Sequence, residues 1–184
     1  MSVSTRKRQE KKVKRGAVAE TVPSRIAVNI TLQPPRYFAR KQVVERLLAA
    51  ILLVPGALVI FVAAVLVRLT SRGWPIFSQL RVGKDGRVFK MYKIRTMIDG
   101  AEKKTGAVWT KPNDPRVTRV GKFLRKLHID EFPQLINVLR GEMSLVGPRP
   151  ERPEFVVNFL KEIPNYSDRL AVLPGITGLA QINL

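Results

Sequence analysis

Two adjacent carboxylates, Asp130 and Glu131, stand at the start of an amphipathic stretch in a chain that is otherwise strongly basic. A carboxylate can attack phosphorus to form an acyl phosphate, and a second carboxylate can hold the cation that shields a diphosphate. Neighbouring acids raise one another's pKa unless a cation lies close, and Arg125 is a candidate for that cation. The structural alternative is that Asp130 only caps a helix and Glu131 only occupies its first turn.

Further basic residues could bind the phosphate groups of a substrate. Arg149 stands between Pro148 and Pro150, and a rigid turn reduces the ordering that a guanidinium needs when it meets phosphate. Its alternative role is that of an ion-pair partner. Lys93 and Arg95 follow one arm of a predicted hairpin as a candidate phosphate-contacting face, although a solvated, lysine-rich strand edge gives the same pattern.

The composition limits the metals and partners that the chain can use. Lys and Arg outnumber Asp and Glu by 33 to 14, which indicates nucleic acid, an anionic membrane surface or phosphorylated substrates as partners. Aromatic residues are few and scattered, which disfavours a membrane-anchored nucleic-acid-binding protein. There is no cysteine and only one histidine, His128, so we expect Mg²⁺, or Mn²⁺ in its place, on carboxylates and phosphates.

An uncharged apolar run over residues 47–67 must lie near a membrane. As a straight helix it would be roughly 31 Å long, about the thickness of the hydrocarbon layer. Basic residues flank both of its ends, and both therefore favour the cytoplasmic side. Pro55 and Gly56 near its middle predict a helix-break-helix element over residues 41–72 that enters one leaflet and returns. A kinked spanning helix is the alternative.

The remaining residues predict an arm and a catalytic domain. Residues 1–40 are basic and rich in turn formers, and we expect a mostly disordered arm that is either a solvated tail or a tether to anionic lipids. Within residues 73–184, Asp85-Gly86 predicts a β-hairpin, periodic apolar residues predict helices over 121–127, 130–139 and 154–162, and 174–178 reads as a turn. The fold class is α+β and helix-rich: a monotopic membrane protein with a cytosolic catalytic helical domain.

Several of these segments together resemble one known family, over about residues 41–184. They are Arg81-Val82-Gly83, 89-FKMYKIRTM-97, 113-NDPRVTRVGKFLRK-126, 129-IDEFPQLINVLRGEMSLVGPRP-150 and 174-PGITGLAQ-181. The chain resembles the bacterial sugar transferase family, the monotopic polyprenyl-phosphate phosphoglycosyl transferases.

The resemblance implies a reaction and a role for each motif residue. Asp130 would take the sugar 1-phosphate from a UDP-sugar as nucleophile and release UMP, and Glu131 would bind Mg²⁺. Undecaprenyl phosphate, a polyprenyl phosphate, would then accept the phospho-sugar as the first membrane step of polysaccharide synthesis. Arg125 and Arg149 stand where the family has phosphate-contacting arginines. The resemblance also implies a proline-broken membrane helix, with the active site at the cytoplasmic face of the bacterial inner membrane.

The chain departs from the family pattern at three places. A basic residue is common directly before Pro-Gly-Ile-Thr-Gly, and here it is Leu173, so we expect one phosphate contact fewer. The family usually has Ser-Pro at the membrane break, and here it is Val54-Pro55. Family members also continue beyond the Gly-Leu-Ala-Gln motif, whereas this sequence ends at Leu184, so we expect a catalytic domain truncated at its C-terminus. A catalytically impaired member that serves as a membrane scaffold is therefore an alternative function. A homodimer is kept open beside a monomer, and the motifs do not identify the sugar.

Overall fold

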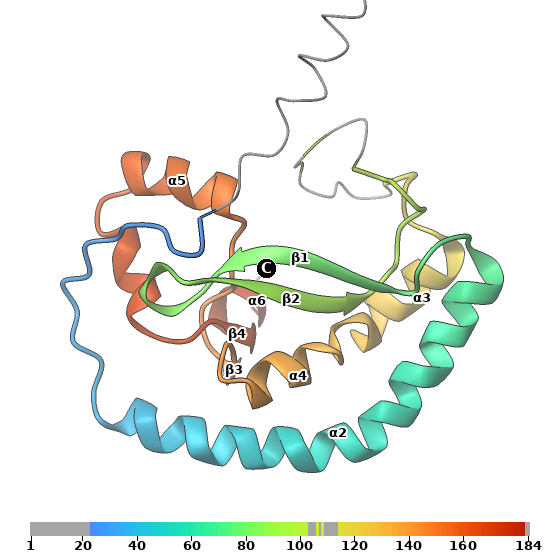
Figure 1. Ribbon diagram of the computed structural model, residues 1–184, viewed down its shortest axis with the longest axis horizontal. Coiled ribbons are helices and arrows are strands. Elements are labelled where there is room, and N and C mark those ends of the chain that lie inside the picture. Colours follow the sequence, from blue (N-terminus) through green and yellow to red (C-terminus); the bar gives the residue numbers. More distant parts are fainter. Residues whose placement is uncertain (1–22, 103–105, 107, 109–113, 183–184) are drawn as a thin grey trace, which may run out of the picture.

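The structure is a computed structural model that describes residues 23–102, 106, 108 and 114–182. It is a helix-rich α+β arrangement in which helices α3 and α4 lie between a central β-hairpin and one long helix, α2 (Figure 1). The described elements are α2 (Tyr37–Thr70), β1 (Ile76–Val82), η1 (Lys84–Gly86), β2 (Val88–Ile94), α3 (Arg119–Lys126), η2 (Ile129–Glu131), α4 (Gln134–Leu139), β3 (Ser144–Val146), α5 (Pro153–Glu162), η3 (Tyr166–Ala171), β4 (Gly175–Thr177) and α6 (Leu179–Ile182).

Helix α2 is continuous through Pro55, so the predicted break into two helices is wrong. Its 34 residues follow a curved path, about 51 Å long at 1.5 Å per residue (Figure 1). One face packs against the rest of the protein along the whole length, through residues such as Ala49, Gly56, Ala63 and Val67. A proline removes only one helical hydrogen bond. Because packing holds both halves of α2 on the same surface, Pro55 is accommodated in a curved helix rather than in a reversal.

The opposite face of α2 exposes a long row of large apolar side chains. Within the described residues, α2 is the one helix long and apolar enough to cross a membrane, and only 17% of its most apolar window is buried. Soluble proteins rarely expose a contiguous apolar surface of this size. The exposed residues include Leu47, Ile51, Val54, Leu58, Phe61 and Leu69.

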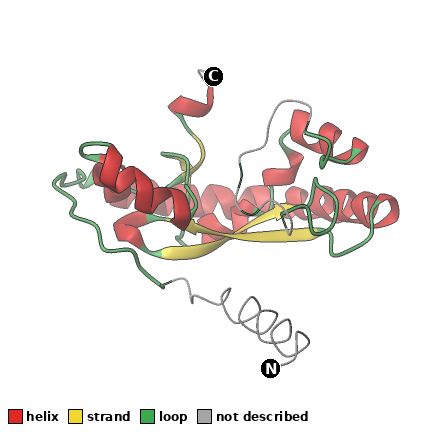
Figure 2. Ribbon diagram, turned by 90° about the horizontal axis from the view of Figure 1, so that it is seen from above, coloured by secondary structure: helices red, strands yellow, loops and turns green. Residues whose placement is uncertain are grey.

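The predicted hairpin is confirmed, and its strands pair antiparallel from Ile76↔Ile94 to Val82↔Val88. Asp85 and Gly86 at the turn both have positive φ, 56° and 74°, a backbone conformation that glycine, and occasionally aspartate, adopts. Side chains from β2, α2 and α4 form one apolar cluster, and in Figure 2 the hairpin runs along the molecule with helices beyond both of its ends. The hairpin therefore provides a surface against which α2 and α4 pack.

Residues 23–36 form an extended strap on the hairpin turn, which corrects the prediction of a disordered arm up to residue 40. The Ile26 N–H donates to the Gly86 carbonyl at 2.8 Å, and the Val88 N–H donates to the Ser24 carbonyl at 2.9 Å. Ile26, Val28 and Ile30 pack against a buried cluster beside α5 and η3. Their alternation is the pattern of a half-buried strand. Residues 1–22 of the predicted arm lie outside the described residues.

The segment predicted as a turn over residues 174–178 contains a short strand, β4, that pairs in parallel with β3. The Gly147 N–H donates to the Thr177 carbonyl, and the Gly175 N–H donates to the Pro148 carbonyl, both at 2.9 Å. Strands of three residues carry too few side chains for a local periodicity, so the sequence could not reveal this pair. The pairing fixes the backbone that leads into the proline-arginine turn.

Candidate active site

Asp130 lies in the 3₁₀ turn η2, between α3 and α4, and does not cap a helix. The predicted helix over residues 130–139 begins at Gln134, and its N-cap residue is Pro133, which provides no side-chain cap. The Asp130 side chain is buried, and its Oδ1 atom has no hydrogen-bond partner. A buried, unpartnered oxygen is uncommon in native proteins and is expected where function requires it.

The surroundings of Asp130 act on its charge in opposite directions. Burial raises the pKa of Asp130 most strongly, and the ammonium of Lys93 lowers it. Adjacent Glu131 raises this pKa further, and Arg125 lowers it. The net effect is a pKa above the ordinary value of an aspartate. Lys93 also binds the neighbouring acid, with Nζ 2.6 Å from Glu131 Oε1. The cations beside the dyad are therefore Lys93 first and Arg125 second, so the hairpin supplies more of the positive charge than the preceding helix.

Arg125 reaches this region from the last turn of α3. Its Nε atom donates to Thr96 Oγ1 at 2.8 Å. Thr118 caps the start of α3 by accepting from the Gly121 N–H at 2.9 Å. A Cβ atom at Gly121 would collide with the Thr96 carbonyl, so this glycine lets α3 approach the end of the hairpin. That close approach places Arg125 beside the dyad.

A small cavity brings together residues that are far apart in the sequence. In this conformation its volume is about 10 Å³, near that of one water molecule, so a diphosphate must bind across its mouth or displace side chains. Arg149 is exposed at this site and forms no ion pair with any described residue. The cavity is lined by Arg81, Met91, Lys93, Glu131, Gln134, Arg149, Pro150, Gly175 and Ile176.

Arg81 is a site residue that the sequence analysis did not select. Its Nη1 atom donates to the Pro150 carbonyl at 3.0 Å, and its Nη2 atom donates to Gln79 Oε1 at 2.6 Å. Burial, opposed by Glu151, lowers the pKa of Arg81 to about 10, which leaves it charged at neutral pH. The Arg81-Val82-Gly83 motif was the sequence signal that could have identified Arg81 as a site residue. Its contact with the arginine turn, however, depends on the register of the two strands.

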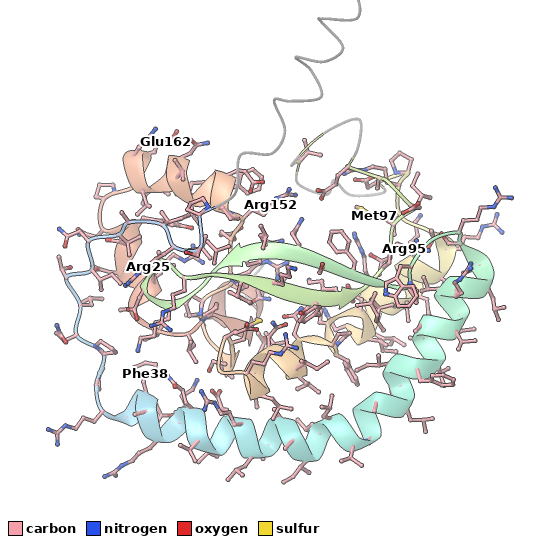
Figure 3. All side chains as sticks on the ribbon, in the orientation of Figure 1. Arg25, Phe38, Arg95, Met97, Arg152 and Glu162 are labelled. Atoms are coloured by element: carbon pink, nitrogen blue, oxygen red, sulfur yellow. The ribbon has the colours of Figure 1, made fainter. Side chains whose placement is uncertain are left out.

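Arg95, in contrast, lies away from this cavity. Its Nη2 atom donates to the Ser71 carbonyl at 3.0 Å, just beyond the C-terminal end of α2. Figure 3 shows Arg95 beside that end of α2, while Arg25 lies at the closed end of the hairpin. The structure therefore brings Lys93, but not Arg95, to the acidic dyad, and Arg95 holds the end of α2 against the hairpin.

The carboxylates of the dyad are the kind of ligand that a magnesium ion uses. Among the described residues there is no cluster of three or more acidic, histidine or cysteine side chains that would form a complete metal cage. Asp130 and Glu131 supply two neighbouring carboxylates, one of which has an unpartnered oxygen. Mg²⁺ commonly uses one or two protein carboxylates and takes its other ligands from substrate phosphates and water.

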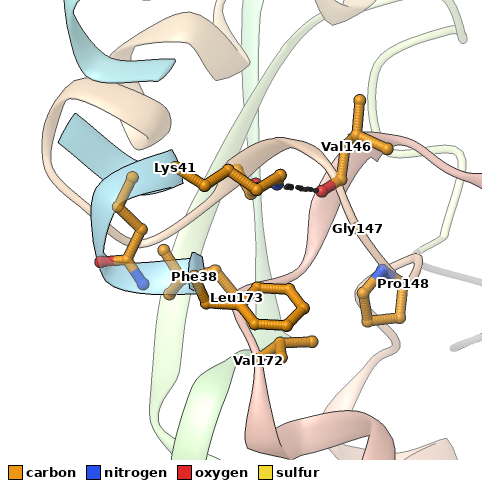
Figure 4. A pocket seen from close by; sticks show the side chains of 9 residues that line it. Phe38, Lys41, Val146, Gly147, Pro148, Val172 and Leu173 are labelled. Atoms are coloured by element: carbon orange, nitrogen blue, oxygen red, sulfur yellow. Dashed lines mark hydrogen bonds between the residues drawn. The ribbon is translucent and has the colours of Figure 1, made fainter. Parts of the chain in front are cut away.

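A buried polar cluster joins the first turns of α2 to β3, directly before the proline-arginine turn. Lys41 Nζ donates to the Val146 carbonyl at 2.8 Å and lies 2.9 Å from Glu45 Oε1. Ser144 Oγ donates to Glu45 Oε2 at 2.5 Å. Beside this cluster is a cavity of about 240 Å³, lined mainly by apolar side chains that include Phe38, Val172 and Leu173 (Figure 4).

Comparisons with known proteins show which family the chain is similar to. A Bacillus subtilis protein provisionally named as an undecaprenyl-phosphate N-acetylgalactosaminyl 1-phosphate transferase is 50% identical over 135 residues, 73% of this chain and 75% of that protein. The UDP-N-acetylgalactosamine-undecaprenyl-phosphate N-acetylgalactosaminephosphotransferase of Aeromonas hydrophila is 44% identical, over 90% of this chain and 41% of its own length. The UDP-glucose:undecaprenyl-phosphate glucose-1-phosphate transferase of Caulobacter vibrioides is 43% identical, over 78% of this chain and 53% of its own length.

The chain thus spans about half or less of the last two relatives. The family described as bacterial sugar transferase matches residues 36–184, a range that contains the membrane-type helix, the hairpin, the acidic dyad and the proline-arginine turn. Together with the 50% identical relative, this match shows that the chain belongs to the bacterial sugar transferase family.

Proposed function

We propose that this protein transfers a sugar 1-phosphate from a UDP-sugar to undecaprenyl phosphate, which yields an undecaprenyl-diphosphate sugar and UMP. The names of its relatives describe reactions of this class. The observation that carries the proposal is the unpartnered, buried Oδ1 atom of Asp130, with Lys93 and Arg125 close enough to oppose the effect of burial on its pKa.

The first half-reaction forms a covalent aspartyl phospho-sugar. Asp130 Oδ1 attacks the sugar-bound phosphorus, the new O–P bond forms, and the bond from phosphorus to the bridging oxygen breaks. The electron pair of that bond leaves with UMP. Lys93 and Arg125 stabilise the negative charge on the transferring phosphoryl group, and Arg149 binds the diphosphate at the mouth of the cavity.

The second half-reaction uses the same phosphorus and returns the enzyme to its starting state. A phosphate oxygen of undecaprenyl phosphate attacks the phosphorus, the Asp130 O–P bond breaks, and Asp130 leaves as a carboxylate. Two in-line steps at one carboxylate need no general base, because the attacking groups, a carboxylate and a phosphate, are already ionised. This agrees with a site that contains no histidine among its lining residues.

Glu131, beside the nucleophile Asp130, is the residue that would hold Mg²⁺, or Mn²⁺ in its place. The bound ion would shield the charge of the diphosphate and so help a negatively charged carboxylate to approach it. We therefore expect excess EDTA to abolish UMP release and added Mg²⁺ to restore it. Full activity in excess EDTA would contradict this role of Glu131.

The protein binds the inner membrane from its cytoplasmic side, and the apolar face of α2 faces the lipid. Lys41 ties the start of α2 to Val146, and Arg95 holds Ser71 beyond its other end. A helix fixed to the catalytic domain at both ends keeps both ends on one side of the membrane. Cysteines at positions 38 and 74 should both label from the cytoplasm, whereas labelling from opposite sides would show a spanning helix.

The covalent mechanism is tested without the lipid acceptor. Wild-type enzyme with UDP-glucose or UDP-N-acetylgalactosamine should release up to one UMP per active site and gain the mass of a sugar phosphate. Asp130→Asn removes the attacking charge at constant size, so the adduct should vanish, whereas Glu131→Gln should form it more slowly. The mechanism fails if Asp130→Asn still forms the adduct, or if UMP appears only when undecaprenyl phosphate is present.

A further inference from the structure

Gln134, the first residue of α4, places an unused hydrogen-bond donor at the active site. The residue is 2% exposed, and its Nε2 atom has no hydrogen-bond partner. Gln134 lines the same cavity as Lys93, Glu131 and Arg149. An amide buried without a partner destabilises the folded protein, so an apolar residue would suit this position better if packing alone mattered.

The backbone places Gln134 next to the proposed nucleophile. Phe132 and Pro133 both have helical dihedral angles, so the chain turns helically from η2 into α4. Residues four apart on such a backbone lie on the same face, which puts Gln134 one turn after Asp130. Asp130 therefore has an unpartnered acceptor and Gln134, one turn later on the same face, has an unpartnered donor, and these two atoms form no hydrogen bond with each other.

A phosphoryl group satisfies both of these atoms at once. Its phosphorus is the atom that the Asp130 oxygen attacks. Its nonbridging oxygens carry negative charge in the transition state and can accept a hydrogen bond from Gln134. We propose that Gln134 is a catalytic residue whose amide nitrogen donates to a nonbridging oxygen of the sugar-bound phosphoryl group while Asp130 attacks it. This assignment rests on the proposed function and adds a neutral donor to the cations Lys93 and Arg125.

Asn137, on the same helix, shows what a structural amide looks like in this protein. It is 0% exposed, and its Oδ1 atom accepts from the Tyr92 N–H at 3.2 Å. Its Nδ2 atom donates to the Lys90 carbonyl at 2.7 Å and to Glu142 Oε2 at 2.6 Å. The fold uses the amide nitrogen of Asn137 but not that of Gln134, so the two residues form a matched pair for mutation.

The test compares Gln134→Leu with Asn137→Leu in thermal unfolding and in a single turnover without lipid. Gln134→Leu should slow adduct formation by about 100- to 1000-fold, the usual effect of losing one donor to a developing oxyanion, with an unchanged or higher Tm. Asn137→Leu should lower the Tm. An adduct rate within about 3-fold of wild type, or a Tm loss in Gln134→Leu as large as in Asn137→Leu, would overturn the assignment.

A binding measurement separates this inference from the covalent mechanism. In the Asp130→Asn background no adduct can form, so the affinity for UDP-glucose and UDP-N-acetylgalactosamine can be measured at equilibrium. Adding Gln134→Leu should weaken binding by about 10-fold, as expected for one hydrogen bond to a charged group. Lack of an adduct with the wild-type enzyme would refute the nucleophile, whereas equal affinities of the single and double variants would refute the Gln134 contact.

Discussion

Glu45→Gln should destabilise the protein, because Glu45 is the buried anion that holds α2 to β3. Glu45 is 6% exposed, and its carboxylate binds Lys41, Ser144 Oγ and the Val146 N–H. Glutamine keeps the size of the side chain and can still accept one hydrogen bond. The substitution therefore removes the charge and one of the two accepting oxygens, and it leaves the Lys41 ammonium without its anion.

The size of the effect follows from how deeply the pair is buried. Removing one partner of a fully buried ion pair costs about 3–5 kcal/mol. The Lys41 side chain is 18% exposed and keeps the Ser144 hydroxyl and the Val146 carbonyl as acceptors, so we expect about 2–3 kcal/mol. For a protein of this length that corresponds to a Tm lower by about 4–12 °C.

The same substitution has a pH signature. Burial alone raises the pKa of Glu45, but hydrogen bonds from Ser144, Lys41 and Val146 outweigh it, and the net pKa is lowered. A lowered pKa in the folded state gives stability that is present above the unfolded-state pKa, about 4.3, and lost as the pH falls through the folded value. The Tm difference between wild type and Glu45→Gln should therefore be full at neutral pH and shrink below about pH 4.

The assay is thermal unfolding in detergent micelles or nanodiscs, followed by tryptophan fluorescence, from pH 7 downward. Glu154→Gln is a suitable control because Glu154 is 55% exposed and its contact with Arg152 is 3.6 Å long. Exposed pairs contribute at most about 1 kcal/mol. Equal stability of Glu45→Gln and Glu154→Gln at pH 7, or a difference that does not change with pH, would refute the reasoning.

Three further outcomes follow from the site and the strap. Asp130→Asn should raise the Tm at neutral pH, because a raised pKa means stability lost as the pH rises through the folded value; a lower Tm at pH 7 would contradict this. Lys93→Met should move the pH midpoint of single-turnover adduct formation upward and slow the reaction at pH 7 by about 10- to 100-fold; an unshifted midpoint would exclude Lys93 as the main cation. Gly86→Ala should cost about 1–2 kcal/mol and release the strap to limited proteolysis, because a Cβ there would strain a positive φ and meet the Ile26 carbonyl; unchanged proteolysis near residue 30 would contradict this.

The sequence predicted the elements whose signals are local. Asp85-Gly86 between apolar, β-branched segments predicted the hairpin because two-residue turns select these residues for their positive φ. The apolar run over residues 47–67 predicted a membrane-type helix by its length alone. The predicted break at Pro55 was wrong because a proline determines only its own hydrogen bond, whereas the packing of both halves of α2 against the domain determined whether the chain reversed.

The sequence also identified several residues of the candidate site, but it did not predict their positions relative to one another. The types and spacing of Asp130 and Glu131, and the turn that contains Arg149, left both a phosphoryl-transfer site and an ordinary capped helix open, and the family resemblance made phosphoryl transfer the prediction. The parallel pairing of β3 and β4, the register of Arg81, and the different positions of Lys93 and Arg95 depend on contacts between distant segments, which no local pattern encodes. That Asp130 Oδ1 and Gln134 Nε2 have no hydrogen-bond partner is visible only in the tertiary structure, because the possible partners of a buried atom include groups from segments that are distant in the sequence.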